Sequence, residues 1–376
     1  MKIKLLAIIV CTLMLTGCWG IIDIENTAFV LSLGIDKISH DELNKESRYE
    51  ITIVNPDTAE AEEGKVLKST IVIGEGSSFN MSIVRLMQRF SKNLNYEHTR
   101  IFLLGEKLLE DDKAVKNILD TLTRDRQFHT SMLILMVPEP NKISDTLSVK
   151  PKTKTLLSFY IQGIAEHELY SARIGRILFH DFVRLITTNH GAAVIPIVIP
   201  DTEEVNITGM GVLKDYKLIG KLDSEETVAY RWCDGRVKGG VLETEEPGFN
   251  PPFIYRSFNR KIKMEKIDND VVYLKYKMAA SGAIEEYTLD GRLVDDSTIK
   301  ELEKRMEEYM KKQCEEIISK FQKEYKVDLI GAGDYLRKYQ PKLYEKVSKD
   351  FDDFFQNNLV IDVDISIKVR RIGKIL

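Results

Sequence analysis

One apolar run at the N-terminus sets the first limit on what this 376-residue chain can form. The run extends from Leu5 to Ile22 and follows two positive residues, Lys2 and Lys4. A short positive start before an apolar stretch is typical of a secretion signal. No later segment approaches the roughly 18 apolar residues that cross a bilayer as a helix. We therefore expect one membrane attachment, at the N-terminus, with everything after Asp23 exported.

The apolar run contains the tetrapeptide Leu15-Thr16-Gly17-Cys18, which resembles the lipobox of bacterial lipoproteins. In that motif small residues admit the processing enzymes, the cysteine sulfur receives a diacylglyceryl group, and cleavage leaves the cysteine first. We predict that residues 1–17 are the signal peptide and that Cys18 is the lipidation site. Two acyl chains hold a protein on a bilayer effectively permanently. An uncleaved helical anchor formed by the same run is the alternative.

The composition is that of an ordinary globular protein. Hydrophobic residues make up 43% of the chain and charged residues 30%, which argues for a packed core and against a disordered or polytopic membrane chain. Removal of Lys2 and Lys4 takes the formal net charge from −4 to −6, so there is no electrostatic reason to bind nucleic acid. The length predicts two or three domains.

Residues 18–200 alternate between strand and helix patterns and predict a mixed α/β N-terminal domain. Glycine and proline punctuate the strand-like runs, and apolar residues at helical spacing mark the segments between them. The expected strands are 29–33, 49–54, 69–73, 100–104 and 132–137, and the expected helices are 79–94, 107–122, 153–165 and 172–187.

A small β-rich middle domain is expected at residues 201–252, because glycines divide this segment into short strand-like pieces. The expected strands are 207–213, 217–222 and 228–233. The proline-rich stretch 245–252 indicates a linker, since proline lacks the backbone N–H that donates to a neighbouring strand and also stiffens the backbone.

Residues 253–376 predict a C-terminal domain with an antiparallel sheet packed against two long helices. The expected strands are 253–266, 271–278, 283–289 and 361–370, and the expected helices are 298–321 and 334–355. Pro341 should kink or break the second helix. The last strand alternates apolar and polar residues, so one face of its sheet should be exposed to solvent. The whole chain is therefore predicted to be a multi-domain α+β protein.

Two cysteines remain once Cys11 leaves with the signal and Cys18 is lipidated. A disulfide between Cys233 and Cys314 is allowed outside the cell. However, Cys314 lies on the apolar stripe of the helix 298–321, where a free thiol packs as a small hydrophobe. A free, buried Cys314 is the favoured interpretation.

The familiar catalytic and metal-binding spacings do not occur in the sequence, so we predict no catalytic residue, cofactor site or metal site, and no enzyme activity. His167-Glu168 begins like a zinc-protease helix, but Ser171 stands where the second metal ligand would be. Gly209-Met-Gly211 and Gly331-Ala-Gly333 lack the third glycine of a phosphate cradle and are interpreted as tight turns. Cys18 is the only residue predicted to carry chemistry.

Cys18-Trp19 is followed by Asp23 and by Val30-Leu-Ser-Leu-Gly-Ile-Asp36. These residues, with further stretches in their order along the chain, resemble the Ger(x)C family, the lipoprotein C subunits of spore germinant receptors. Gly20 departs from the aspartate often found after the tryptophan. The further similar stretches are 98–106, 123–125, 207–222, 322–333, 335–338 and 371–373.

The resemblance implies a three-domain, non-catalytic lipoprotein on the outer surface of the spore inner membrane. It implies assembly with membrane-embedded A and B subunits, and attachment to lipid through the diacylglyceryl group of Cys18 and fatty acyl chains such as palmitate. The B subunit, which resembles an amino-acid transporter, would recognise the germinant, whereas the C subunit would support assembly and signalling required for spore germination. The glycine-rich stretches 209–220 and 331–333 would be shape-determining turns.

Two other classes of protein remain as alternatives. A solute-binding lipoprotein would capture a nutrient itself, but such proteins usually have two βαβ lobes around a cleft, whereas this chain is expected to end in antiparallel strands and long helices. A cell-wall hydrolase would need a carboxylate, Cys/His or metal set, which the sequence lacks.

Overall fold

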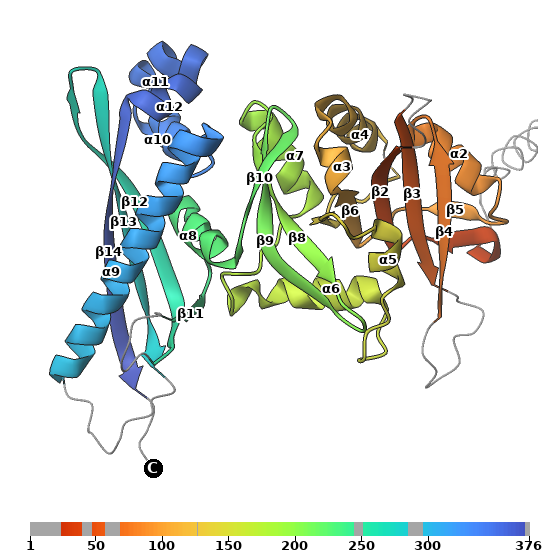
Figure 1. Ribbon diagram of the computed structural model, residues 1–376, viewed down its shortest axis with the longest axis horizontal. Helices are drawn as coiled ribbons and strands as arrows, with labels where there is room; N and C mark the ends of the chain where they lie inside the picture. Colours follow the sequence, from red (N-terminus) through yellow and green to blue (C-terminus); the bar gives the residue numbers. More distant parts are fainter. Residues whose placement is uncertain are drawn as a thin grey trace, which may run out of the picture.

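The computed structural model describes residues 24–39, 47–56, 68–125, 127–243, 251–284 and 296–372. Within these residues the chain forms two bodies that lie side by side along the long axis of the molecule (Figure 1). The N-terminal body contains an eight-stranded sheet, and the C-terminal body contains a four-stranded sheet. The predicted multi-domain α+β class is confirmed.

The large sheet has the strand order β10-β9-β8-β7-β6-β2-β3-β4. Its strands are β2 (Ser32–Ser39), β3 (Ser47–Pro56), β4 (Ser69–Gly76), β6 (Ile101–Gly105), β7 (Leu133–Val137), β8 (Ala193–Pro200), β9 (Val205–Lys214) and β10 (Lys217–Leu222). The central strands β2, β6, β7 and β8 are parallel, and antiparallel strands extend the sheet on both sides. Parallel strands are covered on both faces, which explains the uninterrupted apolar runs of β6 and β7.

Helices cover both faces of this sheet (Figure 1). One face carries α2 (Phe79–Met87), α3 (Glu106–Leu109), α4 (Asp112–Arg124) and α7 (Phe179–Thr188). The other face carries α5 (Ile143–Ser148) and α6 (Leu157–Glu166). A short parallel pair, β1 (Thr27–Phe29) with β5 (Asn93–Asn95), completes the N-terminal body. The predicted mixed α/β character of this part is confirmed.

The middle segment does not form a sheet of its own. β9 and β10 were expected in a separate β-rich domain at 201–252, but β9 pairs with β8 and β10 pairs with β9. The reason is that β8 would otherwise leave one edge of the buried parallel sheet unpaired. The large sheet therefore runs past the predicted boundary at residue 200. The predicted linker 245–252 lies mostly outside the described residues, and the boundary at 252 stays a prediction.

The predicted strand 228–233 is also wrong, because these residues belong to α8 (Ser224–Asp234). Asp223 and Glu226 form a capping box at the start of this helix, and Gly235 ends it in the left-handed conformation. Helix α8 packs against the long helix α9 (Asp296–Lys320) of the C-terminal body.

The small sheet has the order β11-β12-β13-β14. Its strands are β11 (Gly240–Leu242), β12 (Phe253–Asp268), β13 (Val271–Ile284) and β14 (Leu359–Ile372). The first three are antiparallel, as predicted, but β14 is parallel to β13, so the predicted antiparallel direction is wrong for β14. The cause is the helical crossover between β13 and β14, which returns the chain in the same direction. The predicted strand 283–289 starts inside β13, and its remainder lies outside the described residues.

The helices of the C-terminal body lie between β13 and β14 in the chain. α9 buries the predicted apolar stripe, including Met306, Met310 and Cys314. The predicted second helix is broken at Pro341, which is the first residue of α11. The pieces are α10 (Ala332–Tyr339), α11 (Pro341–Val347) and α12 (Phe351–Asn357). Cys233 and Cys314 are both buried and free, which confirms the favoured interpretation of Cys314.

The outer edge of β14 is partly closed by carboxylates from α9. Alternate N–H groups of a strand point to opposite sides, and in β14 those of Ile367 and Val369 point away from β13. They donate to the carboxylates of Glu307 (2.8 Å) and Glu303 (2.9 Å). Lys368 Nζ also donates to Glu303, at 3.0 Å.

In the described part of the chain, no helix combines the length and the apolar character needed to cross a membrane.

Candidate functional site at the junction of the two bodies

Two of the stretches singled out in the sequence meet where the bodies join. The hairpin β9–β10 supplies one side, and the segment 322–333 after α9 supplies the other. Tyr325 Oη donates to the carbonyl oxygen of Lys221 at 3.0 Å, and Lys214 Nζ donates to the carbonyl oxygen of Lys326 at 2.6 Å. The apolar core also continues across the contact, through residues that include Leu222. The C-terminal body is therefore seated on the edge of the large sheet; we call this contact the junction.

Glycine allows the close approach at the junction. A Cβ on Gly220 would lie 2.5 Å from the ring of Tyr325, so a side chain there would displace that ring. Gly209 has φ +79°, and a Cβ on it would lie 2.6 Å from the carbonyl oxygen of Leu222. Gly209 lies inside β9, where the pairing with β8 shifts register. The predicted tight turn at Gly209 is therefore wrong: the glycine bends a strand at a bulge.

The second glycine pair lies in a loop that is organised by Asp328. The Asp328 carboxylate accepts hydrogen bonds from the backbone N–H groups of Ile330, Gly331, Ala332 and Gly333, at 3.0, 3.1, 3.3 and 2.5 Å. Burial raises the pKa of Asp328, and these hydrogen bonds act in the opposite direction. The predicted turn is confirmed at Gly331, which has φ +83°. The N–H groups at the start of α10 are thus held by a carboxylate of the chain itself, in the place that a bound anion takes in a phosphate cradle.

Arg260 connects this loop to the end of α8. Its Nη1 donates to the carbonyl oxygens of Cys233 and of Ile330, the latter at 2.6 Å. A Cβ on Gly235 would lie 2.5 Å from Arg260 Nε, so the glycine leaves room for the guanidinium. A cation at a helix C-terminus is favoured by the helix dipole.

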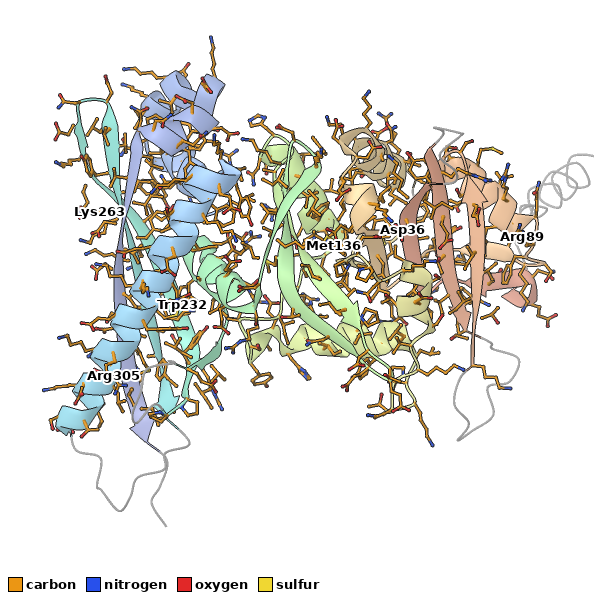
Figure 2. The ribbon with its side chains drawn as sticks, in the orientation of Figure 1. Asp36, Arg89, Met136, Trp232, Lys263 and Arg305 are labelled. Carbon is orange, nitrogen blue, oxygen red and sulfur yellow. The ribbon has the colours of Figure 1, made fainter. Side chains whose placement is uncertain are left out.

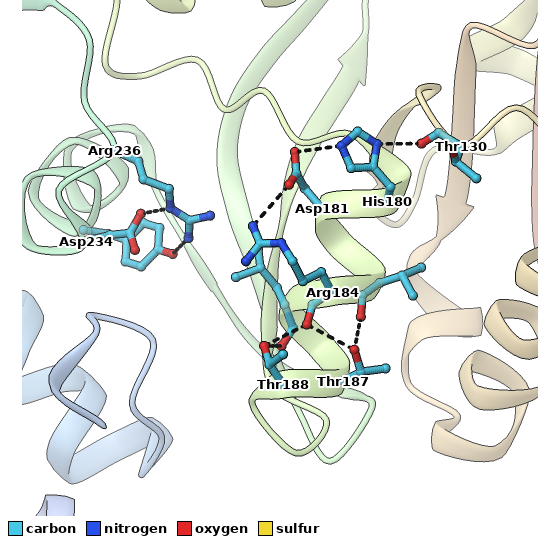
Figure 3. A network of polar contacts seen from close by, with 11 residues as sticks. Thr130, His180, Asp181, Arg184, Thr187, Thr188, Asp234 and Arg236 are labelled. Carbon is cyan, nitrogen blue, oxygen red and sulfur yellow. Dashed lines mark hydrogen bonds and ion pairs between the residues drawn. The ribbon is translucent and has the colours of Figure 1, made fainter. Parts of the chain in front are cut away.

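A cleft of about 560 Å³ opens between the bodies beside these contacts. Its lining comes from α7, β8, β9, α8 and the segment from 327 to 352. Figure 3 shows Arg236 bound to Asp234 on the α8 side, and Arg184 bound to Asp181, at 3.1 Å, on α7. Elsewhere in the lining, carboxylates of the chain bind Arg337 (Asp334, 2.6 Å) and Lys214 (Asp352, 2.8 Å). These cations are neutralised by the chain, so the cleft carries no strong preference for an anion.

A buried ion pair joins α8 to the short turn His167–Leu169 that follows α6. Arg231 Nη2 donates to Glu168 Oε1 at 2.5 Å, and Arg231 Nη1 donates to the carbonyl oxygens of Ala172 (3.4 Å) and Ile174. His167-Glu168, which begins like a zinc-protease motif, therefore supplies a structural ion pair. This pair was not predicted from the sequence; the capping box of Asp223 and Glu226 was the available signal that α8 is a helix.

The carboxyl ends of the parallel strands are where α/β sheets commonly bind ligands. Here Asp36 lies in β2, one residue beyond the stretch that pairs with β6, whereas Glu106 follows β6 and Glu139 lies beyond β7. Burial raises the pKa of Asp36. Lys221 binds Glu106 at 2.6 Å and Lys107 binds Glu139 at 3.0 Å. The cations beside this edge are thus also bound by carboxylates of the chain.

Among the residues that the structure describes, no group of three or more His, Cys, Asp or Glu side chains is placed to hold a metal ion. Cys18, the predicted lipidation site, lies outside the described residues, so its modification stays a prediction.

Comparison with known families decides the identity. The model described as "Spore germination protein N-terminal domain" matches residues 20–200, and the model "Spore germination B3/GerAC like, C-terminal" matches residues 208–373. The chain belongs to this spore germination family. The resemblance seen in the sequence is thereby confirmed, and the matches span both bodies.

Related proteins cover nearly the same length as this chain. Spore germination protein A3 of Bacillus subtilis strain 168 is 26% identical over 391 residues, with 99% of this chain and 98% of the relative covered. Spore germination protein B3 of the same organism is 24% identical, with 96% of each chain covered. The crystal structure of the GerBC protein matches with a TM-score of 0.59 and 21% identity, over 90% of this chain and 98% of that one. That structure has the same fold.

Proposed function

We propose that this spore germination protein is a non-catalytic C subunit of a nutrient germinant receptor, and that it acts in germination through assembly and signalling with membrane-embedded A and B subunits. The observation that carries the proposal is the family match over residues 20–200 and 208–373. Relatives with spore germination names cover almost the whole chain, which supports the same role for it.

The proposed location is the outer surface of the spore inner membrane, with lipid attached at Cys18. The secretion signal and the tetrapeptide Leu15–Cys18 support this location. Two acyl chains on Cys18 would keep the protein on the membrane without any further contact.

The arrangement of the polar residues supports a non-catalytic role. Asp328 accepts hydrogen bonds from the chain itself, and Arg231 binds Glu168. Residues of this kind serve catalysis when they face an accessible site in an unusual environment. Here they connect segments that are distant in the sequence, which fits a protein that holds two bodies in a defined arrangement.

The test is germination of spores that lack this protein. We expect deletion spores to lose the optical-density response to one set of nutrients, and to retain the response to a trigger that bypasses receptors. Complementation with the wild-type chain should restore the response, and complementation with Cys18→Ala should not, because the thioether acceptor is absent. Mass spectrometry of the mature N-terminus reports lipidation directly.

Two results would contradict the proposal. An unmodified Met1 at the N-terminus of the wild-type protein would show that the protein carries no lipid anchor at Cys18. Normal germination on every nutrient, in a strain without a redundant receptor, combined with slow growth on one nutrient, would favour the solute-binding alternative.

A further inference from the structure

Helix α2 exposes an apolar stripe that no described part of the chain covers. Met81, Val84 and Met87 recur every three residues and are 43%, 45% and 47% exposed. Single exposed apolar residues are normal on protein surfaces, but a contiguous group on one helix marks an interaction surface. We call these three residues the α2 stripe.

The stripe is held in a fixed direction by the opposite face of the helix. Leu86 is buried, and Ser82 Oγ donates to the carbonyl oxygen of Tyr49 at 2.9 Å. A Cβ on Gly74 or Gly76 of β4 would lie 2.4 or 2.5 Å from the backbone of Ser82. The helix therefore packs tightly on the sheet, and the α2 stripe faces outward.

Positive charge accompanies the stripe. Arg85, Arg89 and Lys92 are exposed, and in the described residues none of them forms an ion pair. The sequence from Ser77 to Tyr96 contains no acidic residue. By contrast, Lys116 of α4 binds Asp112 at 3.3 Å. Unpaired cations beside an apolar stripe are the composition of helices that lie on anionic membrane surfaces.

The stripe lies at the end of the molecule where the chain begins. α2 ends six residues before β5, and β5 pairs with β1, so that Asn93 is opposite Thr27. Cys18 precedes Ile24, the first described residue, by six residues, which reach at most about 22 Å when extended. Figure 2 shows Arg89 at the end of the molecule opposite the C-terminal body.

We propose that the α2 stripe, with Arg85, Arg89 and Lys92, rests on the headgroup region of an anionic bilayer. The proposal depends on the lipid anchor at Cys18 that is part of the proposed function. The anchor supplies the affinity, and it presents the stripe to the membrane at a high effective concentration. The stripe then orients the protein, with the C-terminal body at the end of the molecule away from the lipid (Figure 1).

The experiment uses the full-length lipidated protein in protein-free vesicles of phosphatidylethanolamine and phosphatidylglycerol. A Met87→Cys variant carries an environment-sensitive fluorophore, and an Ile267→Cys variant is the control, because Ile267 is 52% exposed on the C-terminal body. Cys233 and Cys314 are buried, so labelling is selective. We expect nitroxide-bearing lipids to quench the Met87→Cys label several-fold more than the control label.

The cations give a second readout. Replacing Arg85, Arg89 and Lys92 with Ala should reduce the quenching of the Met87→Cys label in anionic vesicles, since each basic residue near an anionic surface contributes to binding. In vesicles of phosphatidylcholine alone, the parent and the Ala variant should be quenched equally.

The failures are distinguishable from one another. If the protein sediments with vesicles but its Met87→Cys label is quenched no more than the control label, the proposed contact of the α2 stripe with the bilayer is wrong, and the lipid anchor is unaffected. If the Met87→Cys label is shielded from solvent in spore membranes but is not quenched in protein-free vesicles, the proposed bilayer contact is wrong, and the result points to a protein partner. Protein that stays out of the vesicle pellet with an unmodified N-terminus overturns the anchor and this proposal with it.

Discussion

The buried pair of Arg231 and Glu168 provides a quantitative test of how α8 is held. Their side chains are 5% and 9% exposed, and the charged atoms are 2.5 Å apart. Arg231→Met would leave the Glu168 carboxylate buried, with Lys238 at 3.7 Å as its remaining cation. Removing one partner of a buried pair costs about 3–5 kcal/mol. The exposed Lys238 offsets a part of this cost, so we expect the free energy of unfolding to fall by about 3 kcal/mol.

Removing both charges should cost less than removing one. In Arg231→Met combined with Glu168→Gln, no unpaired charge remains, whereas the carbonyl oxygens of Ala172 and Ile174 still lose their donor. Coupling between residues in contact is about 0.5–3 kcal/mol. We expect the double variant to recover at least about 1 kcal/mol relative to Arg231→Met alone.

Urea unfolding followed by tryptophan fluorescence measures these changes. Trp232 is fully buried beside Arg231, and a Trp19→Phe background leaves it as the only tryptophan. Arg173→Met is the matched control, because Arg173 binds the exposed Glu225 and such surface pairs contribute about 0–1 kcal/mol. Two results would refute the reasoning. The first is an Arg231→Met loss in the free energy of unfolding below about 1 kcal/mol; the second is a double-variant loss equal to the sum of the losses in the two single variants.

Two further predictions concern the junction and the buried thiols and phenols. Gly220→Val should lower the free energy of unfolding by about 1–3 kcal/mol, because the added side chain overpacks against Tyr325. In a Tyr325→Ala background the same substitution should cost less. Equal costs in both backgrounds would contradict the contact. The side-chain interaction with Cys233, which favours the protonated thiol, and burial together raise the pKa of Cys314 well above 9.0, and burial raises that of Tyr255 to about 12. Because the unfolded chain releases these protons at lower pH, the stability they contribute is complete below about pH 8 and is lost as the pH rises toward the folded pKa values. The urea midpoint should therefore fall between roughly pH 8 and 11, and a constant midpoint would contradict this.

Local pattern was sufficient for elements that bury a continuous or periodic apolar face. The runs in β6 and β7 and the stripe of α9 were predictable because burial alone determines them. The direction of β14 was predictable in principle, since a helical crossover precedes it, but its clean alternation is the same in parallel and antiparallel sheets. α8 was missed because the short apolar run 228–233 outweighed the capping box in front of it.

Features that depend on distant partners were not accessible from sequence. Nothing near β9 in the chain shows that it pairs with β8 rather than within a separate sheet. Glu168 and Arg231 each have the composition of a solvated surface, and only the fold brings them together. Within the candidate site, the glycines were visible, but the reasons for them, the ring of Tyr325 and the guanidinium of Arg260, come from the other body or from another strand.

The carboxylates of Glu303 and Glu307 have a consequence for how copies of this protein meet. On the proposed membrane surface, copies would meet in two dimensions, where an open strand edge would allow strands of neighbouring copies to add to the sheet. At Ile367 and Val369 the N–H groups that would receive such a strand are already bound. Helix α9 therefore occupies the hydrogen-bond donors that a strand from another copy would need at that end of β14.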